Sequence, residues 1–238
     1  MSATFLLGGE LEVRRLGFGA MRIVKDPAQA PRVLRRALEL GVNLIDTADI
    51  YGTGRSEELI AEALHPYPNG VVIATKGGLG YGFQERGRDA RPERLRAACD
   101  ESLRRLRLER IDLYQLHRHD PEVPIEESVG ALEELRRAGK IRLIGLSNVS
   151  VDQLRAAQTV ATIVSVQNQY NRGLLTSEEV LKVCEAEGIG FFPWEPLGEG
   201  LGEPADELRW LLDRSPIMLP IPGTSSVEHL EANMAAAG

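Results

Sequence analysis

The chain has 238 residues, which is enough for one barrel of eight strand–helix units or for two smaller domains. Its hydrophobic fraction of 43% and charged fraction of 26% are ordinary for a folded, water-soluble protein. The net charge of −7 argues against nucleic-acid binding, and no apolar stretch is long enough to cross a bilayer, so we expect neither partner. The first 15 residues lack the pattern of an export signal, which predicts a cytoplasmic protein. The two cysteines, Cys99 and Cys184, are expected to be buried free thiols, with a disulfide between them as the alternative.

Short apolar runs alternate with longer amphipathic runs along the chain. A hairpin is predicted at residues 5–15, around the turn Gly8-Gly9. The predicted strands are residues 16–20, 42–46, 71–75, 112–117, 141–146, 163–166, 190–193 and 217–220. The predicted helices are residues 31–40, 56–64, 91–106, 125–138, 151–157, 177–187, 205–214 and 227–236. This series predicts an α/β fold, a (β/α)8 TIM barrel with an N-terminal β-hairpin across its bottom, and one domain over residues 1–238.

Active sites of such barrels lie at the carboxyl ends of the strands, so polar residues at those positions are candidates. Asp46 and Tyr51 follow the second predicted strand, Lys76 follows the third and His117 ends the fourth. Each residue alone has a common structural role as a cap, a packing group or a solvated charge. Together they are four ionisable groups on neighbouring strands, and such a cluster costs folding energy unless it is used.

The four groups suit the reduction of a carbonyl. A carbonyl that receives hydride becomes an alkoxide, which must be stabilised and protonated. The phenol of Tyr51 can do both, although its ordinary pKa of ~10 makes it a weak acid near neutral pH. We expect the ammonium of Lys76, held by Asp46, to lower that pKa, and His117 to orient the substrate oxygen. Tyr51, Asp46, Lys76 and His117 are therefore the predicted catalytic residues.

The segments that carry these residues resemble the aldo-keto reductase family. The similar segments are GVNLIDTADIYG (41–52), IATKGG (73–78), DLYQLH (112–117), IGLSN (144–148) and IPGTSS (221–226), and the resemblance runs from about residue 15 to residue 236. It implies an NADPH-dependent, reversible reduction of a small aldehyde or ketone to an alcohol, with Tyr51 as the acid. Gly223 and His229 stand where the commonest family pattern has a Lys and an Arg for the 2′-phosphate, so NADH stays open as the alternative cofactor.

The resemblance also implies a cofactor site. Ser147, Asn148 and Gln167 would hold the nicotinamide carboxamide, Trp194 would stack on its ring, and residues 223–225 would bind the adenosine phosphate at a helix N-terminus. The full implied set is Gly19, Met21, Arg22, Asp46, Ser147, Asn148, Gln167, Trp194, Pro196, Leu197, Ile221, Gly223, Thr224, Ser225, His229 and Asn233.

Two alternatives remain open. The connections after the first, third and seventh predicted strands are short for the family. An alternative hypothesis is therefore that the protein is an NADP(H)-binding module or a minimised scaffold with little or no turnover. The sequence His117-Arg118-His119 is an H-x-H pattern that can bind zinc. The other two histidines lie away from the strand ends, His65 at the end of the second predicted helix and His229 on the eighth, so we predict no metal site. We also expect a monomer.

Overall fold

The computed structural model describes residues 3–80, 87–198 and 202–237. Its strands are β1 (Thr4–Leu7), β2 (Leu11–Arg14), β3 (Phe18–Gly19), β4 (Leu44–Asp46), β5 (Val72–Gly77), β6 (Ile111–Leu116), β7 (Ile141–Ser147), β8 (Ile163–Gln169) and β9 (Gly190–Trp194). Its α-helices are α1 (Ala30–Glu39), α2 (Arg55–Leu64), α3 (Pro92–Leu106), α4 (Ile125–Arg137), α5 (Val151–Gln158), α6 (Glu178–Glu187), α7 (Pro204–Arg214) and α8 (Val227–Met234). Two 3₁₀ helices, η1 (Ala20–Lys25) and η2 (Ala235–Ala237), complete the set.

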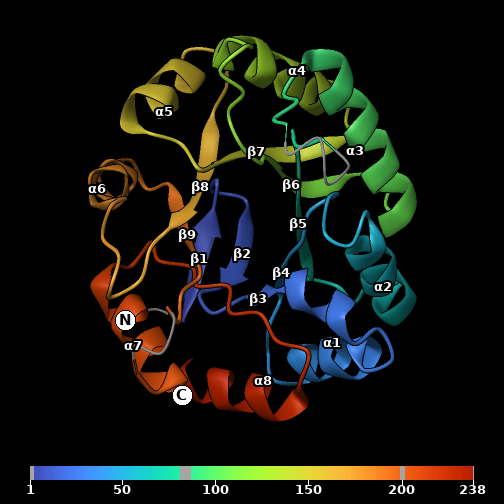
Figure 1. Cartoon of the computed structure of the whole chain (residues 1–238), viewed down its shortest axis with the longest axis vertical. Helices are drawn as coiled ribbons and strands as arrows, with labels where there is room; N and C mark the ends of the chain where they lie inside the picture. The colour runs from blue at the N-terminus through green and yellow to red at the C-terminus, as the bar shows by residue number, and fades with distance from the viewer. Residues whose placement is uncertain (1–2, 81–86, 199–201, 238) are drawn as a thin grey trace.

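Strands β3 to β9 form one parallel sheet in which every strand pairs with its neighbours along the chain. The sheet curls into a barrel, and the helices lie around its outside, with α8 closing the ring between α7 and α1 (Figure 1). The predicted (β/α)8 architecture is therefore confirmed. None of the described helices is long and apolar enough to cross a membrane.

The eighth predicted strand, residues 217–220, is wrong as a regular strand. In the described chain this segment makes only an isolated bridge, between Met218 and Phe191 of β9. Prolines explain the difference, because Pro220 and Pro222 have no backbone N–H to donate to a ladder. Their carbonyls still accept hydrogen bonds, at 2.9 Å from the N–H of Gly17 and at 3.1 Å from the N–H of Gly19 respectively. The segment thus joins β9 to β3 and closes the barrel without a full ladder.

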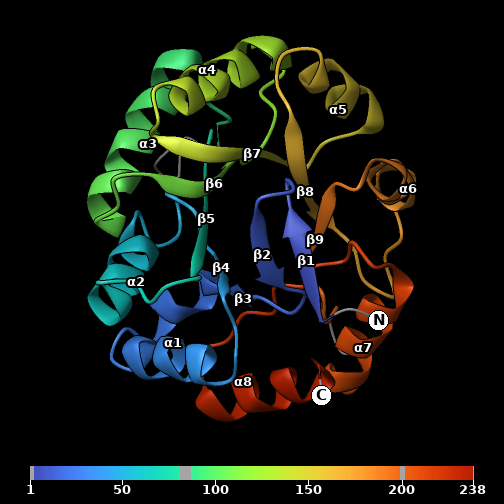
Figure 2. The ribbon, with the colours of Figure 1, turned by 180° about the vertical axis from the view of Figure 1, so that it is seen from behind.

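The predicted N-terminal hairpin is present, and it fills the bottom of the barrel. Strands β1 and β2 pair antiparallel around Gly8 and Gly9, which both have positive φ. Figure 2 shows the hairpin inside the ring of strands and helices. Its buried side chains pack against the inner faces of the barrel strands, in a cluster of Leu7, Leu11, Val13, Leu44, Val72, Ala74, Leu113, Leu143, Val164, Phe192, Leu219 and Ile221. The opposite end of the barrel is thereby left for the polar strand ends.

A second hydrophobic layer lies between the barrel and its helices, and it contains both cysteines. Cys99 of α3 and Cys184 of α6 are buried free thiols, as predicted. Burial raises the pKa of each thiol to about 12, so both are protonated and unreactive at neutral pH.

The loop between β4 and α2 carries Tyr51, and hydrogen bonds of Ser56 fix the end of the loop at α2. Helix α2 begins at Arg55, one residue before the predicted start, and Gly54 occupies its N-cap with a φ of 88°. The hydroxyl of Ser56 is buried, accepts from the Thr47 hydroxyl at 2.9 Å and donates to the Ala20 carbonyl at 3.1 Å. These bonds tie the start of α2 to β4 and η1.

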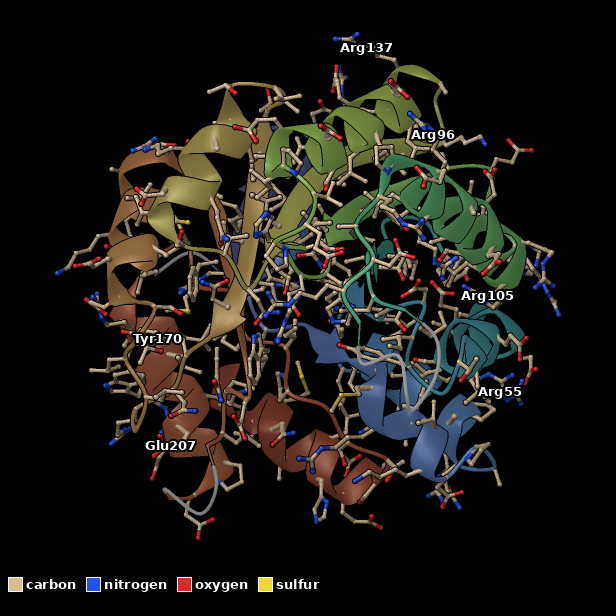
Figure 3. All side chains as sticks on the ribbon, turned by 45° about the horizontal axis from the view of Figure 1, so that its top comes forward. Arg55, Arg96, Arg105, Arg137, Tyr170 and Glu207 are labelled. Carbon is tan, nitrogen blue, oxygen red and sulfur yellow. The ribbon has the colours of Figure 1, made fainter. Side chains whose placement is uncertain are left out.

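A buried ion pair then fixes α2 against α3. Glu57 of α2 is fully buried, and its carboxylate accepts from Arg105 Nε of α3 and from the Thr75 hydroxyl of β5, both at 2.6 Å. Figure 3 shows Arg105 on the side of the molecule where α3 meets α2. A Cβ on Gly54 would lie 2.6 Å from Arg105 Cδ, so the guanidinium side chain also supports the loop that carries Tyr51.

We predict that Glu57→Gln lowers the free energy of unfolding by about 3 kcal/mol, because it removes the buried carboxylate from the Arg105 guanidinium and leaves the pair with the partly exposed Glu101 at 3.4 Å. The matched control is Glu58→Gln on the same helix. Glu58 pairs with Arg55 at 3.1 Å, and both side chains are more than a third exposed, so its loss is expected to cost less than about 1 kcal/mol. Urea denaturation measures both. Equal losses in the two variants would show that the buried pair does not hold α2 to α3.

Candidate active site

The structure brings the four predicted catalytic side chains together at the carboxyl ends of β4, β5 and β6. Asp46 ends β4, Lys76 lies near the end of β5, and His117 directly follows β6. Tyr51 reaches the same place from the loop after β4. The rings of Tyr51 and His117 meet edge to face with their centroids 6.0 Å apart, and Lys76 Nζ lies 5.2 Å from the Tyr51 centroid.

Lys76 is the centre of the group. Its side chain is fully buried, and Nζ donates to Asp46 Oδ2 and to the Thr47 carbonyl, both at 2.7 Å, and makes a third hydrogen bond with Tyr51. An ammonium has three N–H donors, so each has an acceptor. Burial lowers the pKa of Lys76, but the charge of Asp46 and these hydrogen bonds outweigh it, and the pKa lies above its ordinary value. The amine is therefore charged at neutral pH.

The pKa of Tyr51 is raised, whereas the sequence led us to expect that Lys76 would lower it. Burial raises the pKa of Tyr51, the Lys76 ammonium lowers it, and the negative charge of Asp46 raises it again. The sum lies above the ordinary value of 10.0, so the expected contribution of Lys76 is present but does not dominate. The phenol is consequently protonated throughout the neutral range and lies within hydrogen-bonding distance of a fixed cation.

His117 is held as a neutral imidazole. Its backbone N–H donates to the Gly77 carbonyl at 2.8 Å, and its carbonyl accepts from Asn148 Nδ2 at 3.1 Å. Burial, together with the charges of Lys76 and Arg118, lowers the pKa of His117 to about 3. Nδ1 is buried and has no hydrogen-bond partner among the described residues. The ring is thus placed at the rim with one nitrogen unprotonated and the other able to donate.

The residues assigned to the nicotinamide carboxamide form a hydrogen-bonded group beside the catalytic four. The Ser147 hydroxyl donates to the Gln167 carbonyl, and Asn148 Nδ2 donates to the Ser147 hydroxyl, both at 2.9 Å. The Trp194 indole N–H donates to Asn148 Oδ1 at 3.0 Å. Gln167 Nε2 donates to Asp46 Oδ1 at 2.9 Å, so the two groups are continuous.

The predicted phosphate segment lies where the barrel closes. A Cβ on Gly223 would lie 2.6 Å from the Gly19 carbonyl, and a Cβ on Gly19 would lie 2.6 Å from the Ile221 carbonyl, so only glycine fits both positions. Within the described residues, the backbone N–H groups of Gly223, Thr224 and Ser225 donate to no other group. These donors stand directly before α8, whose N-cap Ser226 accepts from the His229 N–H at 3.2 Å.

The other residues implied for the cofactor lie around the same rim or on α8. Met21 and Arg22 are exposed on η1, Pro196 and Leu197 follow β9, Ile221 is buried in the closing segment, and His229 is exposed while Asn233 is buried on α8. Among the described residues, His229 and Asn233 make no hydrogen bond to the catalytic four. The structure therefore places the residues predicted for catalysis and for the carboxamide in one hydrogen-bonded network, and those predicted for the adenosine in a separate group.

The profile of the Aldo/keto reductase family matches residues 15–207. The chain belongs to the aldo/keto reductase family. It is therefore an oxidoreductase, and the resemblance stated from its segments is confirmed.

Individual members of the family match this aldo/keto reductase over almost its whole length. An uncharacterized oxidoreductase of Schizosaccharomyces pombe is 44% identical over 97% of this chain and 83% of its own. The pyridoxine 4-dehydrogenase of Escherichia coli is 39% identical over 99% of this chain and 93% of its own. The solved structure of an aldo/keto reductase from Klebsiella pneumoniae, in complex with NADP and acetate, is 27% identical and superposes with a TM-score of 0.85 over 100% of this chain and 90% of that one.

The residues of this aldo/keto reductase fit a dinucleotide cofactor. The glycine pair Gly19 and Gly223 lets two backbones approach as no side chain would allow, beside three amide donors with no partner in the described chain. Consecutive unpaired N–H groups before a helix suit a phosphate. The amide and indole groups near Asp46 suit a nicotinamide ring and its carboxamide.

The two histidines of the H-x-H pattern, His117 and His119, contact different side chains in the structure. His119 Nδ1 lies 3.0 Å from Gln153 Nε2 of α5, and His117 faces Tyr51. In the described chain no group of three or more His, Cys, Asp or Glu residues is placed to hold a metal ion.

Several residues of the reductase site were not found from the sequence. The Thr47 carbonyl holds Lys76, and Gln115 Nε2 donates to Asp46 Oδ1 at 3.2 Å. Asp49 is fully buried near Glu57, with Arg94 of α3 at 3.7 Å, and burial raises its pKa to about 7. The signal for Gln115 was present, because a polar residue interrupts an apolar strand two positions before His117.

We predict that the imidazole of His117 stays neutral from about pH 8 down to about pH 5, because its lowered pKa lies below that range. Proton NMR of the histidine ring signals, with His117→Gln used to assign the peak, measures this. A His117 signal that titrates with a midpoint near 6.5 would contradict the burial and charge assignment.

Proposed function

We propose that this chain catalyses the reversible, NADPH-dependent reduction of small aldehydes or ketones to alcohols, with Tyr51 as the proton donor. The observation that carries the proposal is the fully buried Lys76 ammonium, which binds Asp46 and Thr47 and leaves its third hydrogen bond for Tyr51. Such a cation beside a phenol stabilises the phenolate that remains after the proton has left.

The chain's own groups carry the proton. A bound nicotinamide cofactor supplies the hydride. The Tyr51 hydroxyl donates a hydrogen bond to the substrate oxygen and gives up its proton as negative charge develops there. Lys76 stabilises the phenolate, Asp46 keeps Lys76 charged, and the neutral ring of His117 donates a second hydrogen bond to the same oxygen. In the reverse direction the phenolate takes the proton from an alcohol.

The substrate class follows from the same arrangement. Two hydrogen-bond donors converge on one oxygen, which suits a carbonyl or an alcohol. The relative from Escherichia coli is named as a dehydrogenase of pyridoxine, an aromatic primary alcohol. A panel of aliphatic and aromatic aldehydes that includes pyridoxal is therefore the appropriate first screen, followed by the loss of NADPH absorbance. Binding of NADPH with no consumption by any aldehyde would support the cofactor-binding module instead.

We expect Tyr51→Phe to reduce kcat by at least about 10²-fold, since the variant keeps the ring and removes the proton donor. NADPH affinity, measured by fluorescence titration, should be unchanged. The matched control is Tyr67→Phe, which removes a hydroxyl that donates to the Leu106 carbonyl at 2.8 Å, outside the site. That control should keep its turnover. Retention of most activity by Tyr51→Phe would overturn the assignment of the proton donor.

The proposed preference for NADPH has its own test. We expect kcat/KM with NADPH to exceed that with NADH by at least about tenfold, because Ser225 and the start of α8 offer donors to a 2′-phosphate. Ser225→Ala should reduce the advantage of NADPH and leave the NADH reaction unchanged. Equal kcat/KM values for the two cofactors would contradict this preference and leave the carbonyl chemistry intact.

A further inference from the structure

Gln115 lies inside the barrel, one layer below the catalytic rim. It is on β6, two positions before His117, and it is fully buried. Alternate residues of a strand point to the same face, so its side chain lies on the inner face of the sheet. Its Nε2 donates to Asp46 Oδ1 at 3.2 Å, which joins β6 to β4 on the other side of β5.

The hydrogen bonds of Asp46 are divided between its two oxygens. Oδ1 accepts from Gln115 and from Gln167, and Oδ2 accepts from Lys76 at 2.7 Å. Two amide donors on one oxygen fix the plane of the carboxylate, so the other oxygen faces the ammonium. A buried carboxylate needs such donors, because it has left water and its charge is only partly offset by its partner.

The orientation of the Gln115 amide supports a role for its N–H group. A carboxylate accepts hydrogen bonds and donates none, so the NH₂ end must face Asp46. The other end, Oε1, is then buried without a hydrogen-bond partner among the described residues. Leaving a buried acceptor unsatisfied is costly, and an apolar side chain would avoid that cost. The presence of a glutamine at this position is therefore explained by the N–H group that it donates to Asp46.

We propose that Gln115 is a positioning residue, which fixes Asp46 so that Lys76 stays in contact with Tyr51. The proposal rests on the proposed function, in which Tyr51 transfers the proton. Without Gln115, Asp46 Oδ1 keeps a single donor, and the carboxylate can rotate. Lys76 follows it, and the phenolate of Tyr51 loses part of its stabilisation.

The first variant is Gln115→Met, which keeps an unbranched side chain and removes the donor. We expect kcat to fall by about tenfold, which corresponds to one hydrogen bond to a charged group. In alcohol oxidation, the rise of kcat with pH reports formation of the phenolate. This rise should move to higher pH by about half a unit or more, because the phenolate is less stabilised. KM for NADPH should change little.

The second variant is Gln115→Glu, which makes the donor depend on pH. A protonated carboxylic acid at this position donates to Asp46 Oδ1, and an ionised one repels it. We therefore expect the variant to approach wild-type kcat at low pH and to fall below Gln115→Met at high pH. A residue that only fills space would not produce this crossing of the two profiles.

The matched control is Ser165→Ala. Ser165 of β8 is buried in the same layer, and a Cβ on Gly145 would lie 2.1 Å from its hydroxyl and 2.9 Å from Gln115 Cγ. Its hydroxyl has no hydrogen-bond partner among the described residues, so its removal changes packing without touching Asp46. We expect the wild-type pH profile. Melting temperatures of all three variants show whether each one is folded.

Three outcomes overturn the proposal: a wild-type pH profile and kcat in Gln115→Met, effects of equal size in Gln115→Met and Ser165→Ala, or no crossing of the Met and Glu profiles. These failures are distinct from failure of the proposed function. If Tyr51→Phe is inactive while Gln115→Met behaves as wild type, only the role of Gln115 falls. If Tyr51→Phe stays active, the proton-donor assignment falls with it.

Discussion

The site depends on one charge kept away from water. The Lys76 ammonium is fully buried inside the barrel, and it is stable there only because each of its three N–H groups has an acceptor and Asp46 supplies the opposite charge. The acceptors come from the end of β4 and from the loop that follows it. The position of that loop is therefore part of the electrostatics of the site. The hydrogen bonds of Ser56 and the pair Glu57–Arg105 hold it from outside the barrel.

Much of the fold could be predicted from the sequence because each strand and helix has its own local signal. β5 is a run of buried residues typical of a strand covered on both faces, and Gly188 ends α6 in a left-handed conformation. The position of the candidate site could be predicted from the parallel topology. Parallel strands bring their carboxyl ends to one rim, so Asp46, Lys76 and His117 had to be neighbours.

The rest depended on distances and burial that a linear pattern does not contain. Gln115 and Asp46 are 69 positions apart, and only the curvature of the barrel brings their side chains together. The direction of the pKa shift of Tyr51 is set by burial competing with the Lys76 charge, and the sequence shows the charge but not the burial. The prediction of a strand at residues 217–220 was wrong. An apolar run favours a strand, but the prolines at 220 and 222 lack the N–H donors that a regular ladder needs.

The closing segment also makes one joint of the barrel unlike the others. Where β3 meets residues 217–222, the backbone contact consists of a few hydrogen bonds, supplemented by Arg15, which donates to the Met218 carbonyl 203 positions away. Contacts between residues so far apart in sequence carry a large loop-closure entropy, which slows folding. Gly19 and Gly223 face each other across the joint. Under the proposed function a dinucleotide would bind at this joint, and its binding free energy would stabilise the closed barrel.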